Sequence, residues 1–261
     1  MEIFVGIRDA RALAWVLFSR DVKAQYRQTY LGYFWAFVPP LAASLTFIFL
    51  QSQGIVTVDT GGVPYPAFAM IGTLLWQVFV ESLLSPSQNL MSAKSMLVKI
   101  NFPREALFLS GVYLIVFNFL IRLVLLAAVL LYWQIPFSSS IFLFPLAVLA
   151  LMACGFAFGL MIAPTGALYG DVSKAIPVMA QFWMLLTPVV YPPQTAGIAA
   201  YLTSWNPVSP LVVTARECLT GQALSMIEPF WIVFGVSLLV VFLALVILRV
   251  AFPRIIERMG G

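Results

Sequence analysis

Residues Leu107–Trp133 read LFLSGVYLIVFNFLIRLVLLAAVLLYW, and this run contains a single charged residue, Arg122. A helix of roughly 20 apolar residues crosses the ~30 Å hydrocarbon core of a bilayer, so the run is long enough to span it. In the whole chain of 261 residues, 62% are hydrophobic and only 9% are charged. The run is continuously apolar rather than alternating, which favours a helix over a barrel strand. The sequence therefore predicts an all-α integral membrane protein.

Five more apolar runs predict a single transmembrane domain with six spans in residues 34–252. An amphipathic segment, residues 1–33, is expected before the bundle, and a cytoplasmic tail, residues 253–261, after it. The stretch Ala12–Phe18 is short and flanked by charges, so we expect no cleavable signal peptide. The six expected spans are about Phe34–Leu50, Tyr65–Leu84, Leu107–Trp133, Ile141–Pro164, Ile176–Tyr191 and Phe230–Phe252.

The positions of Lys and Arg predict the orientation of these spans. Twelve of the 14 basic residues lie before the first span, in the loops after the second and fourth spans, or after the last span. The opposite loops contain only Arg216, and Arg122 falls within the third span. Because short cytoplasmic loops are enriched in Lys and Arg, we expect both termini in the cytoplasm. The net charge of +4 is explained by this topology, so no nucleic-acid partner is expected.

Composition argues against catalysis and metal binding. The chain has no His, and its two cysteines, Cys154 and Cys218, offer neither a disulfide framework nor a metal cluster. The ten Asp and Glu residues are scattered, whereas a membrane transferase or hydrolase needs several reactive groups at one interface. We find no internal repeat and no acid near the middle of an expected span, which are features of ion-coupled transporters.

Residues 7–33 have the pattern of a helix that lies on the membrane surface. Arg20, Lys23 and Arg27 recur on one helical face, whereas Trp15–Phe18 and nearby residues are apolar. Two roles are open for this helix: anchoring the chain to anionic lipid, or docking a partner.

The segment between the second and third expected spans predicts a separate short helix. Ser85-Pro86 has the pattern of a helix start, a capping hydroxyl followed by proline. Phe102-Pro103 ends the helix, because the residue before proline disfavours helical angles. Its apolar stripe at helical spacing is Leu90, Ala93, Leu97 and Ile100. Two roles are open here as well: a connector whose lysines contact lipid phosphates, or a helix offered to a soluble partner.

The last loop, residues 192–228, is too apolar for an ordinary extracellular loop. Its two halves, Ala196–Leu202 and Ser209–Leu219, are too short to span a bilayer and are separated by Asn206-Pro207. We therefore expect two short re-entrant helices, which are tolerated where protein or a wet cavity surrounds them.

Arg122 should lie about 22 Å along the third span, at ~1.5 Å per residue. A charge at that depth usually faces a partner or water. Glu81 is expected near the inner end of the second span, away from Arg122. Glu217, on the second short outer helix, is the better counter-charge, so we hypothesise an Arg122–Glu217 pair that ties the outer helices to the bundle.

Small residues recur four apart in the fourth expected span, at Gly155 and Gly159, and again at Gly166 and Gly170. Residues four apart share a helix face, and glycines there let two helix backbones approach closely. The spacing predicts tight helix packing, either within one chain or between two.

The chain resembles the membrane subunit of type-2 ABC exporters, in the branch that exports O-antigen and related cell-surface polysaccharides. The motifs that carry the resemblance follow the family's order along nearly the whole chain. They are Arg20-Asp21-Val22-Lys23, Tyr26-Arg27-Gln28-Thr29, Leu31-Gly32, Trp35-Ala36, Pro39-Pro40, Leu97-Val98-Lys99, Phe102-Pro103-Arg104, Gly170-Asp171-Val172, Thr187-Pro188-Val189-Val190-Tyr191-Pro192 and Asn206-Pro207.

The resemblance implies a subunit of the bacterial inner membrane that pairs with a second copy of itself and binds two copies of a separate ATPase. Its implied function is ATP-driven export of a lipid-linked polysaccharide, with teichoic acid, capsule or a small amphiphile or drug as the alternative substrate. None of the 16 glycines is followed by lysine, so the chain has no phosphate loop of the G-x-x-x-x-G-K-[ST] type. ATP and Mg²⁺ are therefore expected on the partner subunit, with no cofactor on this chain.

The resemblance also implies roles for three groups of residues. The coupling helix that docks on the ATPase comprises Leu90, Lys94, Leu97, Val98, Lys99, Asn101, Phe102, Pro103 and Arg104. The N-terminal interface helix contributes Arg20, Asp21, Lys23, Tyr26 and Arg27. The outer gate comprises Trp205, Asn206, Pro207, Arg216 and Glu217, with Arg122 as its link to the bundle. Because sugar rings pack on aromatic faces, the candidates for lining the pathway are Tyr33, Trp35, Trp76, Phe182, Trp183 and Tyr191.

Overall fold

The computed structural model describes residues 2–26, 32–54, 59–93, 105–136, 138–193 and 197–260. Within these ranges the chain is helical and contains no strand, which confirms the all-α class. The elements in order are α1 (Glu2–Tyr26), η1 (Gly32–Ala36), α2 (Val38–Ser52), α3 (Tyr65–Ser92), α5 (Glu105–Tyr132), η2 (Ser139–Leu143), α6 (Phe144–Leu168), α7 (Gly170–Leu186), α8 (Gly197–Trp205), α9 (Val208–Thr220) and α10 (Ile227–Gly260).

Four helical segments in the described part of the chain are long and apolar enough to cross a bilayer. They are Tyr65–Ser92, Glu105–Tyr132, Ser139–Leu168 and Ile227–Val250. The first and fifth expected spans fall on α2 and α7, which have 15 and 17 residues. At ~1.5 Å per residue these two helices are about 22 and 25 Å long, shorter than the ~30 Å hydrocarbon core. The four long helices are thus shown, and the six-span arrangement stays a prediction.

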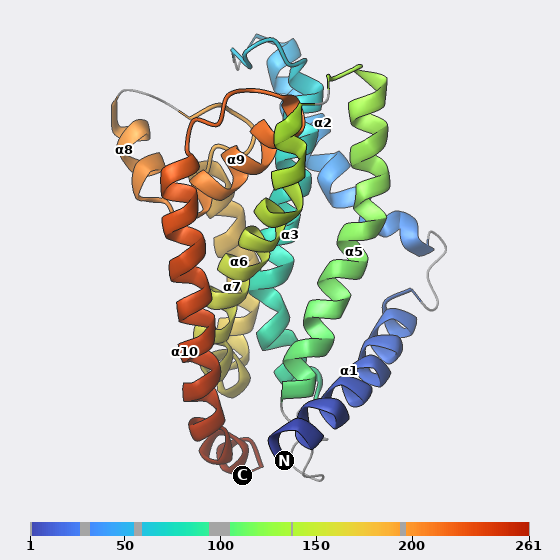
Figure 1. Ribbon diagram of the computed structural model, residues 1–261, viewed down its shortest axis with the longest axis vertical. Coiled ribbons are helices and arrows are strands. Elements are labelled where there is room, and N and C mark those ends of the chain that lie inside the picture. The colour runs from blue at the N-terminus through green and yellow to red at the C-terminus, as the bar shows by residue number, and fades with distance from the viewer. Residues whose placement is uncertain are drawn as a thin grey trace.

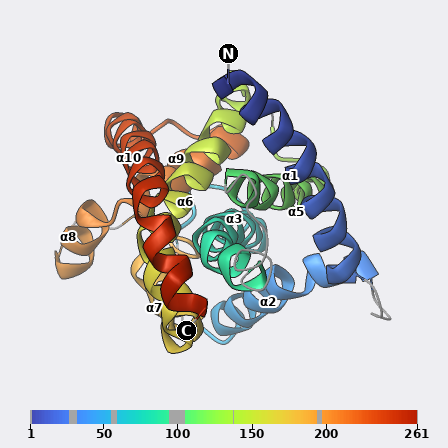
Figure 2. The same ribbon diagram turned by 90° about the horizontal axis from the view of Figure 1, so that it is seen from below.

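The centre of the bundle is α3, which α2, α5, α6, α7 and α9 contact (Figures 1 and 2). In the most apolar 18-residue window of α3, 72% of the residues are buried, against 17% in α10. A helix that is apolar on all sides must be covered on all sides by protein or lipid. Protein therefore covers α3, and α10 leaves most of its surface for other apolar contacts.

The glycines of α6 allow it to pack closely on α3. A Cβ at Gly155 would lie 2.5 Å from the carbonyl oxygen of Phe79, and a Cβ at Gly159 would lie 2.5 Å from that of Leu83. Real Cβ atoms do not approach so closely, so only glycine permits this contact between helix backbones. The predicted tight packing is confirmed, and it occurs within one chain.

The predicted helix start at Ser85-Pro86 is wrong, because α3 continues through Pro86 to Ser92. Both residues are buried inside the bundle. An internal proline removes one helix hydrogen bond and usually kinks or ends the helix. Here the ring lies against α6, where a Cβ at Gly159 would be 2.9 Å from Pro86 Cδ, so packing on α6 holds the helix together past this point.

The N-terminal segment forms a helix, α1, that packs along α5 (Figure 1). Ala10, Ala14 and Leu17 are buried against the same cluster as Leu107 of α5. The other side of α1 presents exposed residues such as Trp15, at 61% exposure. A helix is thus present up to Tyr26, where α1 ends, and its position on a membrane surface stays a prediction; residues 27–31 lie outside the described part of the chain.

The two short outer helices are also present, as α8 and α9. Every residue of α9, from Val208 to Thr220, is buried. This helix packs against α3, α6 and α10 (Figure 1). Burial explains the apolar residues of α9, whereas those of α8, such as Ile198 at 82% exposure, lie on the surface.

Candidate functional site

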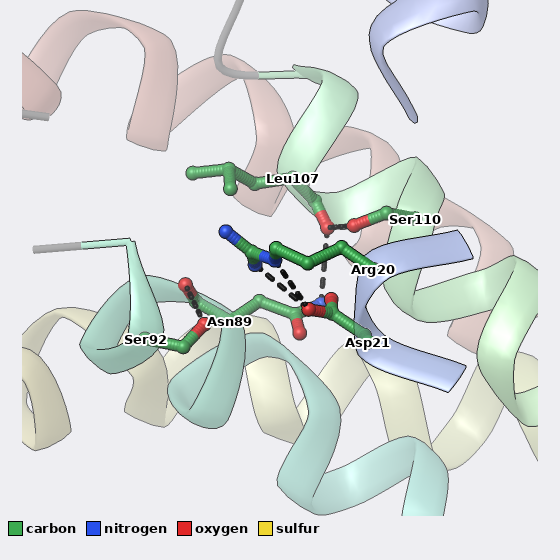
Figure 3. Close-up of polar contacts among 6 residues, drawn as sticks. All are labelled: Arg20, Asp21, Asn89, Ser92, Leu107 and Ser110. Carbon is green, nitrogen blue, oxygen red and sulfur yellow. Dashed lines mark hydrogen bonds and ion pairs between the residues drawn. The ribbon is translucent and has the colours of Figure 1, made fainter. Parts of the chain in front are cut away.

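One side-chain hydrogen bond joins the C-terminal end of α3 to the first turn of α5 (Figure 3). Asn89 Nδ2 donates to the carbonyl oxygen of Leu107 at 3.0 Å and to Ser85 Oγ at 3.3 Å. Ser110 Oγ donates to the same Leu107 oxygen at 2.8 Å. A Cβ at Gly111 would lie 2.2 Å from Asn89 Nδ2, so glycine leaves the room that the amide needs. The Asn89–Leu107 bond thus joins the two ends of the connection that the sequence predicts to carry the coupling helix.

Of the predicted coupling residues, Leu90 is fully buried as part of α3. It therefore packs inside this chain and is not available to a partner there. The others lie outside the described residues, and their role stays a prediction: Lys94, Leu97, Val98, Lys99, Asn101, Phe102, Pro103 and Arg104.

On α1, Arg20 and its neighbour Asp21 form an ion pair, with Arg20 Nη2 2.7 Å from Asp21 Oδ1. Figure 3 shows this pair on α1 together with the α3–α5 contacts. Lys23 is exposed one turn further along. Of the other predicted interface residues, Tyr26 is the last residue of α1 and Arg27 lies outside the described residues.

Arg122 of α5 forms an ion pair with Glu81 of α3, through Nη2 and Oε1. The Arg122 side chain is 6% exposed and that of Glu81 is 24% exposed. The hypothesised Arg122–Glu217 pair is therefore wrong. Glu81 had been expected near a helix end, but α3 runs eight residues beyond the predicted span, which places this acid well inside the helix. The expectation that no acid lies near the middle of a span is corrected for the same reason.

Asn206 joins α7 to the junction between α8 and α9. Its Oδ1 accepts the indole N–H of Trp183 at 3.1 Å and the backbone N–H of Val208 at 3.0 Å. Its Nδ2 donates to Thr187 Oγ1 at 2.8 Å. The side chain thereby caps the start of α9 and holds the end of α7 beside it. Trp205 and Pro207 flank this amide; Trp205 is exposed.

Arg216 of α9 is buried and holds the chain that follows α7. It donates from Nη1 to the carbonyl oxygens of Pro188 and Val189, at 3.1 and 2.9 Å. Its guanidinium also lies 3.7 Å from the ring centre of Phe68, a cation–π contact with α3. A Cβ at Gly72 would lie 1.9 Å from the Val189 oxygen, so this segment is wedged between α3 and α9.

Glu217 closes the turn between α9 and α10. Its Oε2 accepts the backbone N–H of Ser225 at 2.9 Å, and its Oε1 accepts the Ser225 hydroxyl at 2.5 Å. Arg216 and Glu217, both singled out from the sequence, are thus buried near the end of α9, and Asn206 lies before its start. The hydrogen bonds of Arg216 to Pro188 and Val189 could not be predicted from the sequence, because every residue has a backbone carbonyl group and residue type does not show which of them accepts a bond.

The aromatic candidates for the pathway fall into two groups. Trp76 and Trp183 lie in the core: the Trp76 ring is 5.0 Å from Phe79, and the Trp183 ring is 5.2 Å from Phe79. Trp35 and Phe182 are exposed, and the Tyr191 hydroxyl donates to the Leu185 carbonyl oxygen at 2.9 Å. The side chain of Tyr33 is outside the described part. Which of these rings line a pathway stays a prediction.

No cluster of three or more potential metal ligands occurs among the described residues. Cys154 and Cys218 are both buried free thiols. The polar side chains described above contact one another and the backbone at helix ends, and the Arg122–Glu81 ion pair joins two long helices. This arrangement holds helices in place.

Long apolar helices packed around a central helix, with a charge pair buried between two of them, define an α-helical integral membrane protein. The model of the ABC-2 type transporter family matches residues 12–220. The chain belongs to this family, which confirms the resemblance inferred from its motifs.

Two similar proteins extend the comparison beyond the family match. The chain is 26% identical over 239 residues to the O-antigen export system permease protein RfbA of Myxococcus xanthus, covering 90% of each chain. It is 21% identical over 212 residues to the O-antigen export system permease protein RfbA of Klebsiella pneumoniae, covering 80% of this chain and 81% of that protein.

Proposed function

We propose that this chain is the membrane-spanning subunit of an ATP-driven exporter that moves a lipid-linked O-antigen or related polysaccharide across a bacterial inner membrane. The observation that carries the proposal is the similarity to an O-antigen export permease over 90% of both chains. The proposed complex contains two copies of this chain and two copies of a separate ATPase subunit, which binds ATP and Mg²⁺.

Six spans with both termini in the cytoplasm form part of the proposal. One residue separates η1 from α2, so 21 residues from Gly32 to Ser52 are available for this crossing, with η1 at an angle to α2 (Figure 1). A crossing requires ~20 residues, and α7, with 17, is at the lower limit. Figure 1 shows α1 beginning and α10 ending at the same end of the bundle, as an even number of crossings requires.

Exposed apolar faces on α2 and α7 support pairing with a second copy. Leu45 and Phe49 of α2 are more than 60% exposed, as are Met179 and Phe182 of α7. Figure 2 shows both helices on the same flank of α3. A second copy against this flank would cover these faces and place Phe182 beside a pathway between the two subunits.

The fastening of α3 to α5 supports a mechanical role for the connection between them. The Asn89–Leu107 hydrogen bond joins the two helices where the connection leaves and returns. A push on that connection would therefore move α3 and α5 together, and α3 contacts α2, α6, α7 and α9. ATP-driven closure of the partner subunits would in this way reach the outer helices.

The test is to purify the tagged chain from its native membrane and to delete its gene. We expect an ATPase subunit to copurify, and we expect the deletion strain to accumulate finished polysaccharide on the cytoplasmic face of the inner membrane while synthesis continues. A homodimer without an ATPase, together with export that needs no ATP, would overturn the proposal. Polysaccharide that still reaches the surface in the deletion strain would reject this substrate class.

A further inference from the structure

A cavity of about 560 Å³ lies between α1, α5, α6 and α10, away from the contacts described above. Its size is within the ~300–1,000 Å³ range of small-molecule sites. Its walls are largely apolar, including Phe108 and Val112 of α5, Phe156 of α6 and Val246 of α10. Phe242, which also lines it, is 63% exposed on the outer face of α10. The cavity therefore opens sideways beside an apolar surface.

Three charged side chains lie at one end of this cavity: Arg11, Glu105 and Arg249. Glu105 is the first residue of α5, and Val112 lies seven residues further along; Phe242 lies seven residues before Arg249 on α10. At ~1.5 Å per residue, both helices place apolar lining about 10 Å from the charges. The cavity thus has a charged mouth and an apolar depth, the two regions that a phospholipid itself has.

The charges at the mouth can take a ligand. Arg249 Nε and Glu105 Oε1 are 3.9 Å apart, and their side chains are 78% and 60% exposed. An ion pair that is so long and so exposed contributes little to stability. Arg249 can therefore bind a competing anion instead of Glu105. Arg11 is exposed as well. Among the described residues that line the cavity, two arginines and one glutamate give a net charge of +1.

We propose that this cavity is a binding site for a phospholipid with one net negative charge, of the phosphatidylglycerol type. Arg11 and Arg249 bind the phosphate, and one acyl chain lies between α5, α6 and α10. The Glu105 carboxylate accepts hydrogen bonds from the headgroup hydroxyls. The side-chain charge of +1 matches the charge of −1 on phosphatidylglycerol, whereas phosphatidylethanolamine is neutral overall.

Native mass spectrometry of the purified full-length protein tests this site directly. The detergent-solubilised protein is titrated with phosphatidylglycerol and, separately, with phosphatidylethanolamine of the same acyl chains. We expect the wild type to retain phosphatidylglycerol about tenfold better, since each basic side chain near a lipid phosphate contributes to binding. Arg11→Gln with Arg249→Gln should remove this preference, and Arg11→Lys with Arg249→Lys should keep most of it.

Two further variants separate the site from general attraction and test its depth. Lys174→Gln removes an exposed positive charge outside the cavity lining and should leave the preference unchanged. Val246→Trp fills the apolar part and should reduce retention of both lipids. Only variants that elute from gel filtration as a single peak like that of the wild type are compared, so that a loss of lipid binding cannot be caused by misfolding.

Equal retention of the two lipids by the wild type would overturn the proposal. An equal loss of preference in the Lys174→Gln variant would also overturn it, because the attraction would then be a general effect of surface charge. A preference for phosphatidylethanolamine would show that Glu105 rather than the arginines selects the headgroup, and would also reject it. The readout is lipid binding alone, so its outcome is independent of whether the chain exports a polysaccharide.

Discussion

Removing one member of the Glu81–Arg122 pair should destabilise the protein far more than removing both. The Arg122 side chain is 6% exposed and that of Glu81 is 24% exposed, so neither is well solvated by water. At ~3 Å and an effective dielectric constant of ~20, two unit charges attract by about 5.5 kcal/mol. Burying the charges costs several kcal/mol per ion, so the net contribution of the intact pair is small.

The single variants Glu81→Leu and Arg122→Leu each leave one buried charge without its counter-charge. Such a change costs about 3–5 kcal/mol, and the partial exposure of Glu81 favours the lower figure. For a chain of this size, ~1 kcal/mol shifts the Tm by about 2–4 °C, so each single variant should lose about 6–12 °C. The double variant should lie within about 3 °C of the wild type, because leucines replace both charges.

Thermal unfolding of the purified protein in one detergent measures all four members of this double-mutant cycle. A matched cycle with Arg122→Leu and Glu217→Leu is the control, because Glu217 is bonded to Ser225 instead. Its two effects should add within about 0.5 kcal/mol. If the losses of Glu81→Leu and Arg122→Leu also add, the pair contributes no coupling and the reasoning fails.

Three other changes test the remaining contacts. Gly159→Leu should prevent close packing of α6 on α3 and abolish the monodisperse gel-filtration peak, whereas Gly170→Ala, with nothing within 4 Å of its Cβ, should leave the peak unchanged. Asn206→Ala removes four hydrogen bonds of the amide and should lower stability by about 1–3 kcal/mol in thermal unfolding; an unchanged Tm would refute its joining role. Lys94→Glu with Lys99→Glu should abolish copurification of the ATPase and leave the Tm unchanged; intact complexes would make this segment a lipid-facing connector.

The packing of α6 on α3 could be predicted because its signal is local. Residues four apart lie on one face of a helix, so Gly155 and Gly159 mark a close contact before the partner helix is known. The short outer helices could be predicted for a similar reason, since Asn206-Pro207 interrupts an apolar run. In both cases the residue types indicate the local backbone conformation or spacing, but they do not indicate which element packs there.

The predictions that failed depended on where a helix ends. Ser85-Pro86 has the local pattern of a helix start, but α3 continues through it. Packing of the Pro86 ring against Gly159 outweighs the loss of one helix hydrogen bond. The misplaced end then put Glu81 too near the edge of the bundle, and Glu217 was chosen as the counter-charge of Arg122. One wrong boundary therefore produced a wrong ion pair.

The sequence alone determined the class of the protein and the glycine face of α6, because hydrophobicity and helical spacing are properties of neighbouring residues, and its motifs carried the resemblance to the family. Only the tertiary structure decided which charges meet, which aromatic rings are buried and that Arg11, Glu105 and Arg249 share one cavity mouth. Those groups are far apart along the chain. Their proximity arises from the packing of whole helices, which no local pattern encodes.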